Sequence, residues 1–417
     1  MKLDYKKTVF VGLAFMSISS FWQLYNYIIP LILKNTFGVS DAISGYVMAA
    51  DNLLAVFLLP LFGALSDRVN TRFGKRKPFI VVGTFLAASL LFLIPLADRT
   101  KNLTLLVVAL GVLLLAMSSY RAPAVALMPD VTPAPLRSKG NAIINLMGAL
   151  GGIMTYLVIS LFGKSYTTVF AIVAGFMVFC AIVLMLKVPE NKLVAEVPKE
   201  EPKLDPNAGK KMPREVFRSL CFILISVFLW FMAYNAVETA YSRYVQDVWH
   251  RSEQVGSTMM IVAMLVATAA YLPVGMLSAK FGRKKVILFG VCLMAAAFLV
   301  GFMMPGYSIL AWIIMGVIGI GWASINVNSY PMVVEMSKGS DMGKYTGLYY
   351  TFSMSAQILT PILSGYLFTY TPWGYKVLFP YAVIFCGLAI LTMLFVRHGD
   401  NRPEMPADKT ELFGGED

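Results

Sequence analysis

Three charged side chains lie within long apolar segments, where an unpaired charge is costly. Asp51, Arg121 and Glu238 each interrupt a different run of hydrophobic residues. A charge at the centre of a membrane-spanning helix costs about 2.5–3.5 kcal/mol or more unless a partner neutralises it, and such residues often bind substrates or carry protons. We therefore predict proton coupling by these three residues, with purely structural ion pairing as the alternative.

Asp51 and Arg121 are expected to act as a coupled pair. Asp51 is the well-buried carboxylate of the first half of the chain, and a buried guanidinium at Arg121 needs such a partner. Protonation of Asp51 would release Arg121 to bind substrate or to let the molecule change conformation. Glu238 is a second candidate for binding a proton or substrate, and its alternative role is an ion pair with Arg243.

Aromatic and amide side chains recur at helical spacing in several of the apolar segments. Their combination suits a sugar, because C–H faces stack on rings and hydroxyl groups need paired donors and acceptors. Aromatic belts at the membrane surface use the same residue types and remain the alternative. The predicted substrate-binding residues are Trp22, Gln23, Tyr25, Asn26, Asn52, Tyr120, Arg121, Asn145, Trp230, Tyr234, Asn235, Glu238, Trp322, Asn326 and Gln357.

A basic turn follows the segment that carries Asp51. Its acid, Asp67, is expected to cap the following backbone or to pair with Arg68, Arg72 or Arg137, and so to hold one conformation shut. Alternatively, the basic residues of this turn only anchor the helix ends at the membrane surface. The predicted gating residues are Gly63, Asp67, Arg68, Arg72, Asp130 and Arg137.

The elements that must position these residues are membrane helices. The chain has 417 residues, of which 58% are hydrophobic and only 14% charged. Apolar runs of about 20 residues, the length that crosses a bilayer, recur along it, and we count twelve. The prediction is an all-α membrane protein with twelve transmembrane helices.

The distribution of Lys and Arg predicts the orientation of these helices. Most of the 35 basic residues fall in connections on one side of the membrane, and that side is expected to be the cytoplasmic one. Both termini lie on the same side. The expected location is the cytoplasmic (inner) membrane. The net charge of +12 then faces lipid headgroups, so we expect membrane lipid as a partner and no nucleic acid.

The two halves of the chain repeat one another. Gly63-Ala-Leu-Ser recurs as Gly275-Met-Leu-Ser, and Phe73-Gly-Lys-Arg-Lys recurs as Phe281-Gly-Arg-Lys-Lys. Two repeated six-helix bundles are the plan of the major facilitator fold, which binds its substrate between them. The predicted divisions are an N-terminal bundle (1–187), a cytoplasmic linker (188–214), a C-terminal bundle (215–398) and a cytoplasmic tail (399–417).

Two segments carry a more specific likeness. The turn from Asp67 to Phe79 and the segment from Ala126 to Asp130 resemble the glycoside-pentoside-hexuronide:cation symporter family, particularly its sucrose-carrier-like branch. The resemblance implies proton-coupled symport of a disaccharide or another glycoside by alternating access. Sodium-coupled members carry paired acids where this chain has Ala55 and Leu59, so the resemblance favours a proton over sodium.

A proton-coupled exporter of drugs or metabolites on the same fold is the main rival. Exporters often carry a Gly-Pro-Gly-Gly element in the fifth span, and the segment from Met147 to Gly152 has the glycines without the proline. Motifs for nucleophilic catalysis, phosphate binding or metal ligation are missing from the sequence, so we expect neither an enzyme nor a bound cofactor or metal. We expect a monomer.

Overall fold

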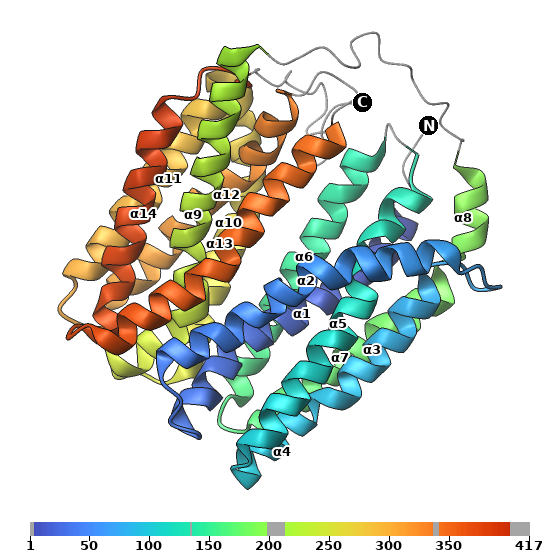
Figure 1. Ribbon diagram of the computed structural model, residues 1–417, viewed down its shortest axis with the longest axis horizontal. Coiled ribbons are helices and arrows are strands. Elements are labelled where there is room, and N and C mark those ends of the chain that lie inside the picture. Colours follow the sequence, from blue (N-terminus) through green and yellow to red (C-terminus); the bar gives the residue numbers. More distant parts are fainter. Residues whose placement is uncertain (1–3, 134–135, 198–212, 337–341, 401–417) are drawn as a thin grey trace.

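Two groups of long helices make up the protein, seen in a computed structural model that describes residues 4–133, 136–197, 213–336 and 342–400. Helices α1 to α8 form one group and α9 to α14 form the other (Figure 1). The helices are α1 (Tyr5–Asn35), α2 (Asp41–Arg68), α3 (Lys77–Leu91), α4 (Leu93–Thr100), α5 (Leu103–Val131), α6 (Arg137–Phe162), α7 (Tyr166–Lys187), α8 (Glu190–Glu196), α9 (Arg214–Asp247), α10 (Glu253–Phe281), α11 (Arg283–Met303), α12 (Ile309–Val334), α13 (Met342–Tyr370), the 3-10 helix η2 (Gly374–Val377) and α14 (Leu378–Leu394).

Eleven helical spans in the described residues are long and apolar enough to cross a membrane, with α3 and α4 together forming one of them. We count α13 as the twelfth, since it has 29 residues, although Ser, Thr, Tyr and Gln side chains make it more polar. The all-α membrane fold predicted from the sequence is confirmed. The four divisions of the chain stay a prediction. A short helix, α8, forms inside the predicted linker, and residues 198–212 and 401–417 lie outside the described residues.

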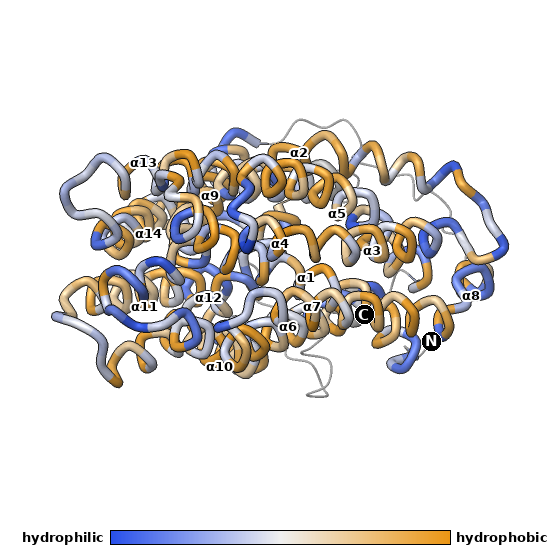
Figure 2. The backbone as a smooth tube through the Cα atoms, turned by 90° about the horizontal axis from the view of Figure 1, so that it is seen from below, coloured by the Kyte–Doolittle hydropathy of each residue, from blue (hydrophilic) through white to orange (hydrophobic). Residues whose placement is uncertain are grey.

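The molecule has two ends that differ in composition. Because each half contains an even number of spans, α1 begins and α14 ends at the same end, at the top of Figure 1. We call it the termini end, and the opposite one, which holds the α1–α2 and α9–α10 connections, the far end. Figure 2 shows hydrophobic residues along the helices and hydrophilic ones around α8 and the α2–α3 turn. The hydrophilic α2–α3 turn and α8 thus lie at the termini end.

The two halves meet closely at the far end, where α2 packs against α13. A Cβ on Gly45 would lie 2.2 Å from the carbonyl oxygen of Pro361, and one on Gly365 would lie 2.3 Å from that of Asp41. Only glycine permits the two backbones to come this close. The glycines therefore fix the place where the halves touch.

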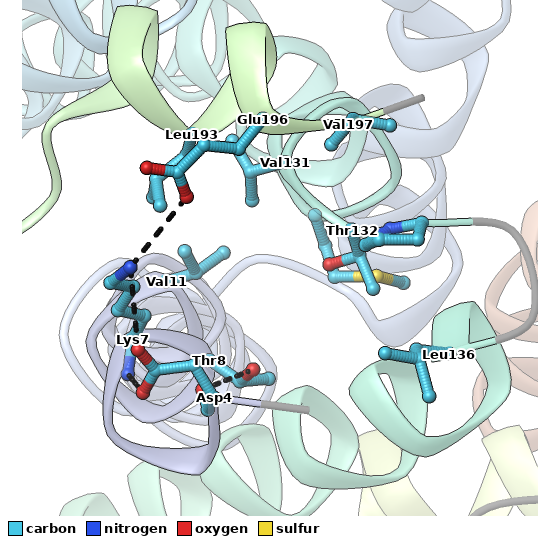
Figure 3. A pocket seen from close by; sticks show the side chains of 12 residues that line it. Asp4, Lys7, Thr8, Val11, Val131, Thr132, Leu136, Leu193, Glu196 and Val197 are labelled. Atoms are coloured by element: carbon cyan, nitrogen blue, oxygen red, sulfur yellow. Dashed lines mark hydrogen bonds and ion pairs between the residues drawn. The ribbon is translucent and has the colours of Figure 1, made fainter. Parts of the chain in front are cut away.

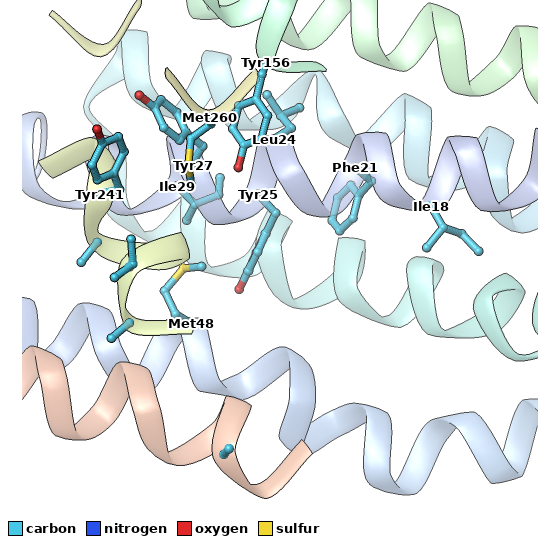
Figure 4. Packing of buried hydrophobic residues seen from close by; sticks show 14 of the residues in the cluster. Ile18, Phe21, Leu24, Tyr25, Tyr27, Ile29, Met48, Tyr156, Tyr241 and Met260 are labelled. Atoms are coloured by element: carbon cyan, nitrogen blue, oxygen red, sulfur yellow. The ribbon is translucent and has the colours of Figure 1, made fainter. Parts of the chain in front are cut away.

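Aromatic residues of α1 fill the interior of the first half and its boundary with the second. Phe21, Tyr25 and Tyr27 are almost fully buried, and Tyr156 of α6 and Tyr241 of α9 are equally enclosed. Figure 4 shows Tyr27, Tyr156 and Tyr241 gathered in one cluster. The rings of Tyr27 and Tyr156 meet edge to face, with centroids 5.5 Å apart. This packing holds α1 in place and so fixes the polar residues on its other face.

Candidate functional site

A cavity of about 210 Å³ lies between the two halves. Five helices, two of them from the second half, contribute its walls. Most of its lining side chains are polar, as expected where membrane helices enclose a pathway for a substrate or an ion. The lining residues are Trp22, Gln23 and Asn26 of α1, Met48, Asp51 and Asn52 of α2, Arg121 of α5, Asn235, Glu238 and Thr239 of α9, and Gln357 and Pro361 of α13.

Helical periodicity explains why these residues share the cavity. Trp22 and Asn26 are four residues apart on α1, and Asn235 and Glu238 are three apart on α9, so each pair lies on one face of its helix. The polar face turns toward the other half, because lipid would leave it without partners. Residues far apart in the sequence thus form one polar surface.

Asp51 is the buried acid of this surface, with 7% of its area exposed. Asn52 donates a hydrogen bond from Nδ2 to Asp51 Oδ1 at 3.0 Å. Arg121 lies near enough for the two charges to interact, yet the structure describes no direct ion pair between them. The guanidinium instead lies over the ring of Trp22, with Cζ 5.3 Å from the ring centroid. The predicted pair therefore faces one cavity but is not in direct contact in this conformation.

Glu238 forms a link across the two halves. The hydroxyl of Tyr156 donates to Gln23 Oε1 at 2.7 Å, and Gln23 Nε2 donates to Glu238 Oε1 at 3.4 Å. Since the tyrosine hydroxyl occupies the amide oxygen, the amide nitrogen must face the carboxylate. Tyr156 was not predicted, because one tyrosine within an apolar segment gives no signal in the sequence.

Several residues predicted to bind substrate lie outside the cavity lining. Trp230, Tyr25 and Tyr120 are almost completely buried in the hydrophobic core. The ring of Tyr234 stacks on that of Trp322, with centroids 3.7 Å apart and planes 5° from parallel. Roles in binding for these residues stay predictions. The same holds for Asn145, exposed on α6, and Asn326, half-buried on α12.

At the far end, polar contacts join the two halves. Arg243 of α9 donates to Asp41 Oδ1 of α2 at 2.7 Å, and the Tyr375 hydroxyl also bonds to Asp41. Lys34 of α1 pairs with Asp247 of α9. The alternative that Arg243 pairs with Glu238 is therefore wrong. Asp41 was overlooked, since it begins a helix, where acids commonly serve as helix caps.

At the termini end, Arg76 is the centre of a network within the first half. Its guanidinium donates to Asp67 Oδ1 at 2.5 Å and to Asp130 Oδ2 at 2.8 Å. The pairing of Asp67 with Arg68, Arg72 or Arg137 was thus wrong. Arg68 and Arg72 are exposed, so an ion pair of either residue with Asp67 would add little to stability.

The remaining predicted gating residues surround this network. Gly63 contributes its carbonyl oxygen, which accepts from Arg76 Nη1 at 3.4 Å. Arg137 donates from Nε to the carbonyl oxygen of Thr132 at 3.3 Å, and the ring of Phe73 lies under the Arg72 guanidinium. Gating by any of them stays a prediction.

The second half repeats the network with a shift in register. Arg283 pairs with Glu335, as Arg76 pairs with Asp130. Matching the two Phe-Gly sequences had instead aligned Arg283 with Lys75. The step from Phe73 to Arg76 is therefore one residue longer than the step from Phe281 to Arg283.

A second cavity, of about 200 Å³, lies at the termini end between α1, α5, the α5–α6 connection and α8 (Figure 3). Lys7 on its wall forms ion pairs with Asp4 at 3.4 Å and Glu196 at 3.9 Å. None of the residues predicted to bind substrate or protons lines it. The polar cavity between the halves is therefore the candidate site.

Comparison with known proteins supports a family assignment. The model of the Major Facilitator Superfamily matches residues 11–267 and 223–413. Proton-associated sugar transporter A of Homo sapiens is 38% identical over 144 residues, which make up 32% of this chain and 19% of that protein. Sucrose transport protein SUC3 of Arabidopsis thaliana is 25% identical over 140 residues, or 29% of this chain and 24% of that protein. These matches thus span a quarter or less of each relative.

Other proteins match over nearly the whole chain. An uncharacterized MFS-type transporter of Methanocaldococcus jannaschii is 24% identical over 387 residues, 88% of this chain and 89% of that protein. Among solved structures, the nucleoside transporter NupG has a TM-score of 0.69 at 17% identity and covers 95% of this chain and 100% of its own. A D-xylose-proton symporter has a TM-score of 0.65 at 16% identity, covering 94% and 96%. The structural likenesses establish the fold.

Proposed function

The chain belongs to the Major Facilitator Superfamily, and from this premise we propose that it is a secondary active transporter that takes up a sugar together with a proton. The observation that carries the proposal is the polar cavity between the halves, which holds Asp51 and Arg121 without a direct ion pair. Relatives named as a proton-associated sugar transporter and a sucrose transport protein support a sugar as cargo.

The cargo we propose is a disaccharide or another glycoside. The turn from Asp67 to Phe79 supports this assignment by its likeness to the sucrose-carrier-like branch of the glycoside-pentoside-hexuronide:cation symporter family. Asn26, Asn52 and Gln357 offer both donors and acceptors to hydroxyl groups, and Trp22 offers a ring face. A neutral polyol suits such a surface better than an apolar compound.

Proton coupling would work through Asp51. When the carboxylate is charged, its attraction holds the Arg121 guanidinium nearby. A proton on Asp51 removes that attraction, and Arg121 becomes free to donate hydrogen bonds to the sugar. Alanine and leucine stand at residues 55 and 59, where sodium-coupled members carry acids, which supports a proton as the coupling ion.

Alternating access would move the two halves about this cavity. We assign the termini end to the cytoplasm, because the basic turns at Lys75 and Lys284 lie there. The contacts of Asp41 with Arg243 and of Lys34 with Asp247 close the far end in this conformation. In this proposal the far end is the outer side, closed by these contacts, and the cavity would release its cargo into the cell.

Transport by reconstituted protein tests the proposal. Vesicles with an inward proton gradient and labelled sucrose, maltose or D-xylose should accumulate sugar with wild-type protein. Asp51→Asn should lose accumulation but keep sugar exchange, because exchange needs no net proton movement. Glu196→Gln, an exposed acid away from the cavity, is the control. Undiminished uphill uptake by Asp51→Asn would remove Asp51 from the mechanism, and proton-driven extrusion instead of uptake would favour the exporter.

A further inference from the structure

Tyr350 is a large aromatic side chain on the cavity-facing side of α13. It lies seven residues before Gln357, which lines the cavity, and seven residues are close to two full turns. The two side chains therefore share a face of the helix, with Tyr350 about 10 Å nearer the termini end. Its exposed fraction is 55%, so about half of the side chain is left open.

The ring of Tyr350 is supported by two other tyrosines. Tyr349 meets it edge to face at 5.7 Å between centroids, and Tyr330 of α12 lies 6.3 Å away. Hydrogen bonds fix both neighbours, because Tyr349 bonds to Ser329 at 2.9 Å and Tyr330 to Thr346 at 3.0 Å. Among the described residues the hydroxyl of Tyr350 has no such partner. Two fixed tyrosines thus hold the ring of Tyr350 in place while part of it stays open, and a sugar ring can stack on such a surface.

The first half also approaches Tyr350. Arg121, which lines the cavity, is near enough to influence the hydroxyl of Tyr350 electrostatically. Arg121 itself makes no described hydrogen bond or ion pair, so its donors are free for a ligand. Tyr350 thus faces the space between the halves, beside the cavity.

The size of the central cavity indicates why a second surface is needed. Pockets for drug-sized ligands start at about 300 Å³, and this one measures about 210 Å³. A cavity below that range leaves little room for a disaccharide, which has two rings. The second ring has to extend beyond the cavity, and Tyr350 lies next to it along α13, toward the termini end.

We infer that Tyr350, supported by Tyr330 and Tyr349 and facing Arg121, is a second sugar-ring subsite at the termini-end mouth of the central cavity. One ring of a disaccharide occupies the cavity, and the other stacks on Tyr350 while its hydroxyl groups accept from Arg121. The subsite rests on the proposed function and adds to it the residues that would hold the second ring of the proposed disaccharide.

Binding of single sugars and disaccharides to purified protein tests the subsite. Affinities for sucrose, maltose, glucose and D-xylose would be measured for wild-type, Tyr350→Ala and Tyr350→Phe proteins. Tyr366→Ala is the matched control, since Tyr366 lies on the opposite face of α13 with a similar exposure of 56%. Tyr350→Ala should weaken disaccharide binding by about five- to tenfold and leave single-sugar binding unchanged.

Tyr350→Phe distinguishes the loss of ring stacking from a general loss of folding. Tyr350→Phe keeps the ring and should bind disaccharides as wild type does. Unchanged disaccharide binding by Tyr350→Ala, equal weakening for one- and two-ring sugars, or equal losses in the Ala and Phe variants would overturn the subsite. If wild-type protein bound none of the sugars, the proposed function would fail and the subsite with it.

Discussion

Arg243 donates a hydrogen bond to Asp41 at 2.7 Å, and this contact joins the two halves of the protein at the far end. Only 5% of the Arg243 side chain and 14% of the Asp41 side chain are exposed. A transporter that opens outward has to separate these two charges. The pair therefore sets part of the barrier between the conformations.

Removal of one partner of this pair should destabilise the closed far end. Asp41→Ala leaves the Arg243 guanidinium buried without its carboxylate, which costs about 3–5 kcal/mol in buried pairs. We expect a lower melting temperature in detergent and faster labelling of a cysteine placed at the far end of the cavity. Lys34→Ala is the comparison, because 26% and 39% of the side chains in the Lys34–Asp247 pair are exposed and its loss should cost at most about 1 kcal/mol. Equal effects of the two changes would contradict this assignment.

Arg76→Lys should disrupt the termini end although the charge is kept. Arg76 reaches Asp67 and Asp130 at once through separate nitrogens, and a lysine ammonium cannot hold that geometry. The expected result is a several-fold lower transport rate with little change in sugar affinity, measured by uptake and binding on the same preparation. Lys75→Arg, which changes an exposed side chain on the same turn, should behave as wild type. A normal rate for Arg76→Lys would show that the network does not control the conformational change.

Tyr156→Phe tests the link between Gln23 and Glu238. Without the phenol, Gln23 Oε1 loses its donor and the amide is free to turn, which removes the constraint that directs Nε2 at the carboxylate. We expect KM for sugar to rise a few-fold while the maximal rate changes little, since the cavity keeps its shape. Tyr166→Phe, which removes a phenol near the far end, is the control. A change confined to the maximal rate would argue against a positioning role for Tyr156.

The fold could be predicted from the sequence because each membrane helix can be recognised from its own segment of the chain. Each apolar run is long enough to span a bilayer whatever its neighbours do, and the repeated turns at Phe73 and Phe281 reveal the two halves. The polar cavity lining was also visible, since Asp51, Arg121 and Glu238 stand out against apolar surroundings. Helical spacing then indicated which of their neighbours share a face.

Contacts between distant residues could not be predicted in the same way. Trp230 has the same type and spacing as the cavity residues, and only the packing of α9 reveals that it points into the core. Arg76 is one of several basic residues in its turn. Which of them pairs with Asp67 depends on how α2, α3 and α5 pack together. The pairing of Asp41 with Arg243 likewise needs the relative placement of the two halves.

Glu190 should be important for stability although it lies outside the candidate site. Its carboxylate accepts hydrogen bonds from the backbone nitrogens of Lys75, Arg76 and Lys77 at 2.7, 2.9 and 3.0 Å, and only 2% of it is exposed. These nitrogens lead into the start of α3, where the helix supplies no acceptors of its own. Glu190→Ala leaves the donors buried and unpaired, at about 1–3 kcal/mol each.

Thermal unfolding of the purified protein measures this loss, and Glu196→Ala, on the same helix with a largely exposed side chain, provides the reference. We expect a clear decrease in melting temperature for Glu190→Ala and almost none for Glu196→Ala. The melting temperature of Glu190→Gln should lie between those of the two alanine variants. Its amide oxygen still accepts hydrogen bonds from the backbone nitrogens but carries no charge to attract the turn. If both alanine variants melted like wild type, the carboxylate of Glu190 would not be what holds the α2–α3 turn to α8.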